Sequence, residues 1–291
     1  MTNVSSFPTA LVPLIAGWTR RLQARFPKRP LKGLTRLANL LNRLLPAYQG
    51  AITLTNGSRM SVDSRQPAER WLLYSGNYQP ALTMILKRYT PPGGVCFDVG
   101  ANLGFYTVQF GQWVGSTGHV VAFEANPALV QRIEANVALN GFAHIRVVSA
   151  AIHDRAGEIE FHISSNPGKS SVRSIASVVQ TLVVPAITLD GYLSEHPQAR
   201  LDVIKMDIEG NDCQALLGAA ETLRRFRPLI VFEYKPVTPR DIVEAGVRLL
   251  ASLDYDLWAL SRDGTRRPFD ALTKTDTDVV CVPPALKPDF R

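Results

Sequence analysis

The sequence predicts an α/β protein whose mostly parallel sheet carries helices on both faces. From residue 95 onward, short apolar runs alternate with segments of helical periodicity, which is the pattern of repeated strand and helix units. Three of these runs end in carboxylates, at Asp98, Glu124 and Asp207. Because ligands of an open parallel sheet bind at the carboxyl ends of its strands, we expect these side chains to converge on one site.

The first predicted strand, residues 95–97 with Asp98 at its end, leads into a glycine turn and a helix that begins near Gly104. Glycines in such a turn let a ligand approach the backbone closely. The turn reads G-A-N-L-G from Gly100, so it lacks the middle glycine of the G-x-G-x-x-G fingerprint that holds pyrophosphate. The carboxylate of Asp98 would also repel a phosphate held there. We therefore do not expect a polyphosphate ligand.

The other elements of this region follow from apolar runs, which predict strands, and from apolar residues at helical spacing, which predict helices. In chain order they are a strand at 119–124, a helix at 128–139 closed by Asn140 and Gly141, a strand at 145–152, two strands at 158–163 and 181–189 around a polar loop at 164–174, a strand at 201–207, a helix at 213–226, a strand at 228–234, a helix near 240–252, and short strands at 255–260 and 278–282.

Positive charge is concentrated in the amino-terminal part of the chain. Residues 1–62 contain nine Lys or Arg and no Asp or Glu, so this segment carries +9 and the rest carries −2 of the total of +7. A predicted helix at 31–45 places six leucines near one face. We predict a basic, leucine-rich, helical extension at 1–69 and a catalytic domain at 70–291. The extension either packs on that domain or contacts an anionic surface such as lipid headgroups.

Composition and cysteine usage describe a globular protein in a reducing compartment. Apolar residues make up 46% and charged residues 20% of the 291 residues, enough for one large core. Cys96, Cys213 and Cys281 are widely scattered and show no metal-ligand spacing. The apolar stretch at 10–18 is too short to span a bilayer, and its arginines follow it rather than precede it. We expect a cytoplasmic protein, with peripheral membrane contact as the alternative that its extension leaves open.

A cationic ligand suits the acidic strand ends better than a nucleotide phosphate does. S-adenosylmethionine carries an ammonium and a sulfonium group and has no phosphate, so Asp98 beside the turn favours it. Glu124 lies 26 positions after Asp98, at the end of the second strand, where a carboxylate can accept both ribose hydroxyls. The two acids together indicate an S-adenosylmethionine site.

These motifs resemble those of the FkbM family of S-adenosylmethionine-dependent methyltransferases. The resemblance rests on "FDVGANLGFYT", "FEANP", "ITLDGYL", "VIKMDIEGND" and "FEY", which lie within about residues 70 to 235. It implies a class I (Rossmann-like) methyltransferase fold and methylation of a hydroxyl, commonly on a sugar, a glycan or a polyketide-type natural product. The segment "YSGNYQP" departs from the family, which usually has an acid where this chain has Gln79.

The predicted site contains cofactor-binding and catalytic residues. The cofactor-binding set is Asp98, Gly100, Asn102, Gly104, Glu124, Ala125, Ala151 and Asp207. Asp207 is the first candidate for the general base that takes the proton of an acceptor hydroxyl, followed by Glu209 and Glu233. Glu209 has a second interpretation as a cap of the helix that follows it. Carboxylates can also gather a divalent cation, but no spacing here indicates one, so we predict no metal.

Two other functions remain open from the sequence. A nucleic-acid (RNA) methyltransferase could hold phosphates with the basic extension, but the core has no basic stripe, and the extension is rich in leucine rather than interleaved with aromatics. We therefore expect no nucleic-acid partner and predict a saccharide or small-molecule acceptor with a free hydroxyl. A catalytically inactive cofactor-binding module is the other alternative, and the sequence does not indicate an oligomeric state.

Overall fold

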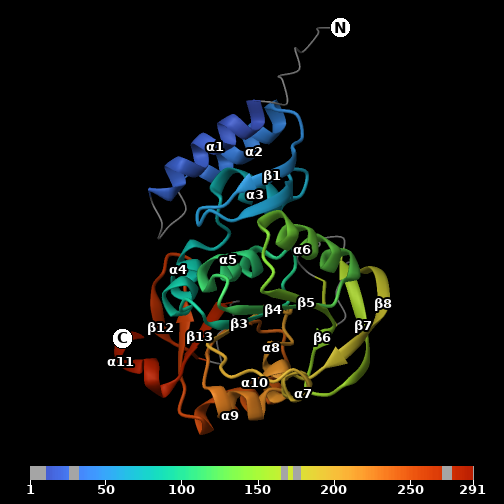
Figure 1. The fold of residues 1–291 in the computed structure, drawn as a ribbon, viewed down its shortest axis with the longest axis vertical. Helices are drawn as coiled ribbons and strands as arrows, with labels where there is room; N and C mark the ends of the chain where they lie inside the picture. Colours follow the sequence, from blue (N-terminus) through green and yellow to red (C-terminus); the bar gives the residue numbers. More distant parts are fainter. Residues whose placement is uncertain (1–10, 26–32, 165–169, 173–177, 271–276, 291) are drawn as a thin grey trace. The chain divides into compact units, whose positions relative to one another are not determined.

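The computed structural model describes residues 11–25, 33–164, 170–172, 178–270 and 277–290 (Figure 1). The chain forms two compact units, one of Met1–Ile85 with Arg262–Gly264 and the other of Leu86–Ser261 with Thr265–Arg291. Two sequence predictions fall partly outside the described residues: the beginning of the leucine-rich helix, with Leu31 and Lys32, and most of the polar loop at 164–174.

The first unit combines helices with a small hairpin. Its described elements are α1 (Leu11–Ala24), α2 (Leu34–Leu44), β1 (Gln49–Thr53), β2 (Arg59–Asp63) and α3 (Pro67–Ser75). Both α1 and α2 pack on α3, and Thr19 Oγ1 donates a hydrogen bond to the carbonyl of Tyr74 at 2.8 Å. The sequence pattern predicts only helix here. The structure adds an antiparallel hairpin, whose Asn56-Gly57 turn is a typical signal for two short paired strands.

The second unit is built on an eight-stranded sheet in the order β12-β11-β13-β10-β9-β3-β4-β5. Its strands are β3 (Val95–Val99), β4 (His119–Glu124), β5 (Ile145–Ser149), β9 (Val203–Met206), β10 (Leu229–Tyr234), β11 (Asp256–Leu260), β12 (Arg266–Pro268) and β13 (Thr277–Val282). Neighbours from β10 to β5 are parallel, whereas β13 is antiparallel to both of its neighbours. The predicted mostly parallel sheet is confirmed.

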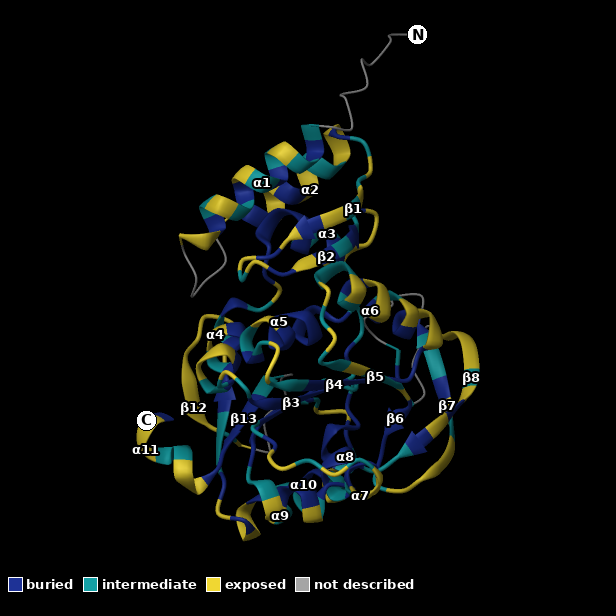
Figure 2. Ribbon diagram, viewed as in Figure 1, coloured by how far each residue is buried: buried dark blue, intermediate teal, exposed yellow. Residues whose placement is uncertain are grey.

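Helices cover both faces of this sheet, as the alternating pattern predicts (Figure 1). One face carries α5 (Phe105–Val114) and α6 (Pro127–Asn140), and the other carries α8 (Asp212–Leu217) and α10 (Arg240–Ser252). The residues of β3 are buried throughout, and Figure 2 shows the central strands as buried. Burial on both faces explains why these strands are continuous apolar runs rather than alternating ones.

The strand order defines where a ligand should bind. From β3 the chain proceeds to β4 and β5 in one direction, and it later returns to β9 and β10 on the other side of β3. Such a reversal between neighbouring strands opens a crevice outside their carboxyl ends, which is the usual ligand position in α/β sheets. The ends of β3 and β9 therefore mark the candidate site.

A second, smaller sheet interrupts the strand and helix alternation. It contains β6 (Ala151–Ile152), β7 (Gly157–Ser164) and β8 (Val178–Ile187), in the order β6-β8-β7. The predicted hairpin is thus present. The predicted third strand at 145–152 is divided, because the chain leaves the central sheet after Ser149 and pairs Ala151 with Ala186 of β8 instead.

The remaining described elements are α7 (Leu189–Glu195), α9 (Ala220–Phe226), the short 3₁₀ helix at Pro284–Leu286, and α11 (Lys287–Phe290), while α4 (Pro80–Tyr89) leads from the first unit into the second. The predicted single helix at 213–226 is broken at Gly218 into α8 and α9, because the chain there passes against the backbone of His153. None of the helices in the described part of the chain has the length and apolar character that a membrane crossing requires.

Candidate active site

The glycine turn after β3 contacts the ends of both neighbouring strands, β4 and β9. The amides of Gly100 and Ala101 both donate to the carbonyl of Phe123 in β4, at 2.9 and 3.0 Å. Gly100 has φ +73°, and a Cβ there would lie 2.1 Å from the carbonyl oxygen of Asp207. Gly104, with φ +80°, precedes α5, and a Cβ there would approach Ile133 of α6. The turn is therefore held between the ends of β4 and β9.

The structure gives Gly100 and Gly104 a different role from the predicted one. From the sequence, these glycines are expected to let a ligand approach the backbone closely. In the structure, a Cβ on Gly100 would collide with the end of β9, and a Cβ on Gly104 would approach helix α6. Their predicted place in a cofactor site therefore depends on the shape that they give the turn.

We expect Gly100→Ala to destabilise the protein far more than Gly141→Ala. Both glycines have a positive φ, +73° and +65°, but a Cβ on Gly141 meets nothing within 4 Å, whereas one on Gly100 collides with backbone. Gly141→Ala should cost about 1–2 kcal/mol, the left-handed penalty alone, and Gly100→Ala clearly more. Urea unfolding of both variants measures the difference, and equal losses would contradict this account of the turn.

Glu124 and Asn102 join the turn to the end of β4. The Glu124 side chain is buried, and its two oxygens accept hydrogen bonds from the amides of Asn102 at 2.8 Å and Asn126 at 2.9 Å. Burial raises the pKa of Glu124, and the two amides oppose that rise. Asn102 adopts a left-handed conformation, φ +54°, which directs its amide to Glu124. A carboxylate has about four acceptor positions, so Glu124 can still accept ligand hydroxyls.

Ala125 and Ala151, the last two members of the predicted cofactor set on this side, are buried in a small apolar cluster. They pack with Phe161 of β7 and Val184 of β8. This cluster adjoins Glu124 along the chain, and the cofactor role of the two alanines stays a prediction.

Asp98 differs from its predicted position at a strand end. It is fully buried inside β3, one residue before Val99, and its Oδ2 accepts a hydrogen bond from Thr107 Oγ1 at 2.6 Å. The Nζ of Lys205 lies 3.8 Å from its Oδ1. Burial raises the pKa of Asp98, and Lys205 and Thr107 counteract that effect. Asp98 therefore has protein partners of its own, which the sequence pattern does not indicate.

Lys205 is the residue that the sequence analysis misses. It lies buried in β9, and its Nζ is 3.8 Å from Asp98 and 3.6 Å from Asp207. The ammonium also lies 5.3 Å from the ring centroid of Tyr106. Burial disfavours the charged form of Lys205, but the carboxylates, first of all Asp207, outweigh burial and raise its pKa. The sequence feature that could have identified Lys205 is its position inside the otherwise apolar run "VIKM".

The three predicted catalytic carboxylates lie together at the ends of β9 and β10. One oxygen from each of Asp207, Glu209 and Glu233 lies within 4.8 Å of the others. Lys235 pairs with Glu209, and its Nζ is 3.1 Å from Glu233. The convergence predicted from the sequence concerns Asp98, Glu124 and Asp207 instead, and of these Asp98 and Asp207 lie on either side of Lys205. Lys235 already supplies positive charge to the cluster, which reduces its attraction for a cation.

Glu233 and Asp207 differ in their electrostatic environment. Burial, together with the nearby charge of Asp207, raises the pKa of Glu233 to about 9. Lys235, whose Nζ contacts both Glu209 and Glu233, opposes this rise. The raised pKa favours the protonated form of the Glu233 carboxyl, whereas the side chain of Asp207 is 36% exposed to water. A base that must accept a proton is better placed at Asp207.

Asp212, rather than Glu209, is the acid in the first turn of α8, and the amides that it binds lie outside that helix. Glu209 does not cap α8: its backbone is left-handed, φ +55°, and its side chain contacts Lys235. Asp212, at the start of α8, is buried and accepts a hydrogen bond from the amide of Gly210 at 3.3 Å and one from the amide of Glu233, also at 3.3 Å. Asp212 thus holds the two catalytic segments together.

The small sheet contacts the same carboxylate loop. Ser171 Oγ lies 3.3 Å from the carbonyl of Glu209, and the side-chain amide of Asn211 donates to Ser171 Oγ at 3.2 Å. Ser171 also pairs through its backbone with His162 of β7. The insertion between β6 and β8 therefore borders the acidic cluster.

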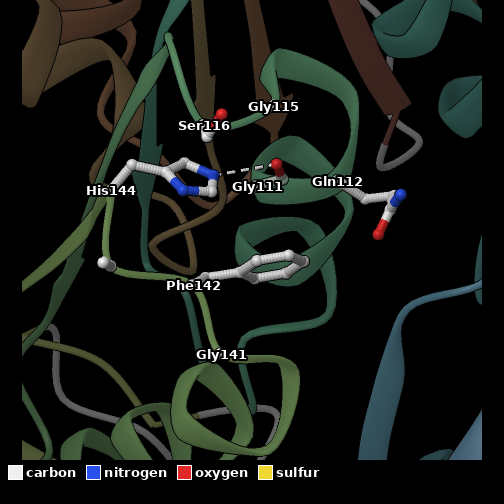
Figure 3. A pocket seen from close by; sticks show the side chains of 8 residues that line it. Gly111, Gln112, Gly115, Ser116, Gly141, Phe142 and His144 are labelled. Atoms are coloured by element: carbon white, nitrogen blue, oxygen red, sulfur yellow. Dashed lines mark hydrogen bonds between the residues drawn. The ribbon is translucent and has the colours of Figure 1, made fainter.

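A surface hollow of about 400 Å³ lies elsewhere in this unit (Figure 3). It is lined by the end of α5 and by residues 141–144, which precede β5, and His144 Nε2 lies 2.9 Å from the carbonyl of Gly111. These segments meet the sheet where β4 and β5 begin, opposite the strand ends that carry Glu124. The hollow is therefore not the crevice that the strand order defines.

A sequence profile of the methyltransferase FkbM domain matches residues 98–257, which is more than half of the chain. The chain belongs to the FkbM methyltransferase family. This confirms the resemblance drawn from the motifs. The protein is accordingly an S-adenosylmethionine-dependent methyltransferase with a class I fold.

Three relatives show how far the similarity extends. The 2-O-methyltransferase NoeI of Sinorhizobium fredii is 26% identical over 186 residues, which cover 58% of this chain and 74% of NoeI. The hexuronic acid methyltransferase AglP of Haloferax volcanii is 24% identical over 206 residues, 71% of this chain and 82% of AglP. The carboxy-S-adenosyl-L-methionine synthase of Dichelobacter nodosus is 28% identical over 130 residues, 43% of this chain and 54%, about half, of that relative.

The site of this FkbM methyltransferase fits a cationic cofactor. Asp98 and Lys205, which are buried, and Asp207, which is partly exposed, together contain two carboxylates and one ammonium, so one negative charge is not matched within the group. No described residue donates a hydrogen bond to Oδ1 of Asp98, which leaves a buried acceptor at the turn. S-adenosylmethionine is cationic at its sulfur and ammonium groups, whereas a phosphate would add like charge.

Proposed function

We propose that this FkbM methyltransferase transfers the methyl group of S-adenosylmethionine to a hydroxyl oxygen of a saccharide. The observation that carries the proposal is the group of carboxylates Asp207, Glu209 and Glu233 beside the cofactor turn. Carboxylates suit a sugar because they accept hydrogen bonds from several hydroxyls and can take a proton from one of them. The names of NoeI and AglP support an oxygen acceptor and a sugar acid, respectively.

The proposed reaction needs a base and an oriented hydroxyl. S-adenosylmethionine supplies a methyl group on a cationic sulfur, so the acceptor oxygen forms the new C–O bond while the S–C electron pair remains on sulfur. Asp207 accepts the hydroxyl proton, and the neutral Glu233 carboxyl donates a hydrogen bond that orients the acceptor. Glu209 fixes Lys235, and Lys235 in turn limits the movement of Glu233.

Cofactor binding is assigned to the opposite side of the crevice. Glu124 accepts the ribose hydroxyls, Asn102 and the glycines Gly100 and Gly104 shape the turn, and the Asp98 and Lys205 pair sets the local charge. Ala125 and Ala151 are assigned to a nonpolar wall beside Glu124. Asp207 is assigned to both groups of residues, because it pairs with Lys205 and is also one of the three carboxylates of the acidic cluster.

We expect Glu124→Ala to weaken S-adenosylmethionine binding by about 1–3 kcal/mol, since hydrogen bonds to a charged group are lost. Isothermal titration calorimetry measures this change, with NAD as a second ligand. Glu158→Ala, at an exposed position in β7, is the control and should bind normally. If NAD binds as tightly as S-adenosylmethionine, or if Glu124→Ala binds unchanged, the cofactor assignment of Glu124 is wrong.

The acceptor class is tested by incubating the protein with methyl-labelled S-adenosylmethionine and a matched panel of acceptors. The panel contains neutral hexosides, hexuronic acids, the same sugars with single hydroxyls removed, and structured RNA. We expect a methyl ether on a saccharide and no label on RNA, with the deoxy sugars identifying the oxygen. Label on RNA, or on a nitrogen or carboxyl group of every accepted compound, would overturn the proposal.

A further inference from the structure

Helices α1 and α2 each have two separate nonpolar faces. The first face of α1 contains Val12, Ala16 and Thr19, which are almost completely buried and pack within the first unit. The second contains Leu14 and Trp18, which are 69% and 63% exposed. Because the packing face is already complete, the exposed pair is not needed to hold α1 in place.

Helix α2 repeats this arrangement. Leu34 and Ala38 are buried, whereas Leu37, Leu40 and Leu44 are exposed and follow one another at helical spacing of three and four residues. The sequence analysis treats packing on the protein and contact with an anionic surface as alternatives for this segment. The structure shows that α2 packs and still presents leucines to solvent.

Arginines border the exposed nonpolar residues on both helices. Arg21 of α1 and Arg25, which directly follows the helix, continue the line of Leu14 and Trp18, since positions 14, 18, 21 and 25 lie on one side of a helix. On α2, exposed Arg36 and Arg43 flank the leucines. We call the set of Leu14, Trp18, Leu37, Leu40 and Leu44, with these four arginines, the amino-terminal face.

We propose that the amino-terminal face binds the surface of an anionic lipid bilayer. Leucines and a tryptophan bordered by arginines are the composition of interfacial helices, whose nonpolar side chains enter the headgroup region while the cations contact lipid phosphates. The +9 charge and the lack of any acid in residues 1–62 complement such a surface.

The same observations argue against other occupants. A second copy of the chain would bring two strongly positive segments together, which is electrostatically unfavourable. A nucleic acid would use the arginines but would leave five large nonpolar side chains without a role. The inference is independent of the proposed saccharide acceptor, because it concerns the first unit and holds for any acceptor.

The test is flotation of the full-length protein with vesicles. We expect binding to phosphatidylcholine vesicles that contain about one quarter phosphatidylglycerol, little binding to pure phosphatidylcholine, and release in about 0.5 M salt. Replacing the four arginines by Gln, or Trp18, Leu40 and Leu44 by Ser, should each lower vesicle affinity by about tenfold or more. Circular dichroism and S-adenosylmethionine binding, which should not change, show that these variants fold.

Control variants carry substitutions of the same kind, two at a time, at other exposed positions. Val179→Ser with Val183→Ser, and Arg224→Gln with Arg240→Gln, should bind vesicles as the unmodified protein does. Trp18 adds a direct readout: its fluorescence should shift to the blue on anionic vesicles and be quenched by brominated lipid, and Trp18→Phe should abolish both changes. The chain contains four tryptophans, so this variant is needed for the assignment.

Three outcomes would overturn the inference. In the first, the intact protein does not bind anionic vesicles at low salt. In the second, the variants of the amino-terminal face bind these vesicles as well as the unmodified protein does. In the third, the protein sediments as a dimer that the Trp18, Leu40 and Leu44 substitutions dissociate. Tight RNA binding that depends on the four arginines, without vesicle binding, would likewise assign the face to nucleic acid.

Discussion

Replacing Lys205 with methionine should destabilise this FkbM methyltransferase by about 3–5 kcal/mol, because it leaves the fully buried carboxylate of Asp98 without its cation. Methionine keeps the length of the side chain, so the loss reports charge rather than volume. The loss should depend on pH. Without Lys205, the pKa of Asp98 rises further above its unfolded value, and stability is therefore lost as pH increases through that range. Urea unfolding at two pH values measures both effects.

The double variant Lys205→Met with Asp98→Asn separates this cause from general damage. It removes both charges and keeps a group that can accept the Thr107 hydrogen bond, so it should recover at least half of the loss and most of the pH dependence. Lys287→Met is the matched control. Lys287 also pairs with two carboxylates, but one of them, Asp254, is 77% exposed, so water screens the pair. An equal loss in that control would contradict the argument.

The glycine turn and Glu124 were predictable because their signals are local. A strand, a turn that needs positive φ, and a helix follow one another within residues 95–114, and the structure places the start of α5 at Phe105 after Gly104. Glu124 similarly ends an apolar run. In both cases the backbone itself determines the position, so neighbouring residues in the sequence are sufficient evidence.

Lys205 and Asp212 were not predictable, because their roles come from residues that are distant in the sequence. Lys205 faces Asp98 only because β9 pairs with β3, and nothing near residue 205 specifies that pairing. In the sequence, Asp212 is an ordinary acid at the start of a helix, and its contact with the amide of Glu233 is visible only in the structure. The same limit explains Asp98: its burial follows from strands on both sides of β3, not from its own segment.

The small sheet shows a further limit of sequence patterns. The alternation in β7 and β8 predicts strands, but it does not indicate that β6 leaves the central sheet to join them. That choice depends on whether residues 151–152 continue along β4, as β5 does, or pair with β8. A pattern along one segment does not contain this information.

Asp207→Asn should lower turnover by about 10²–10⁴-fold, the usual contribution of a general base, and lower S-adenosylmethionine affinity far less. A base acts mainly in the transition state, so its loss lowers kcat rather than cofactor binding. Asparagine keeps the shape of the side chain and can still accept a hydrogen bond from Lys205. Turnover with labelled cofactor and calorimetry of cofactor binding give the two quantities separately.

Glu233→Gln is the matched variant within the same cluster, and it decides between the two carboxylates. The pKa of Glu233 is raised to about 9 by burial and by the charge of Asp207, so at pH 7 its carboxyl is neutral and glutamine imitates it. Glu233→Gln should therefore keep most of the turnover at pH 7 and lose any change in rate near pH 9, where the native carboxyl ionises and adds a negative charge beside Asp207. If Glu233→Gln is inactive and Asp207→Asn remains active, the base is Glu233, because only a group that must lose its proton before catalysis would give that order.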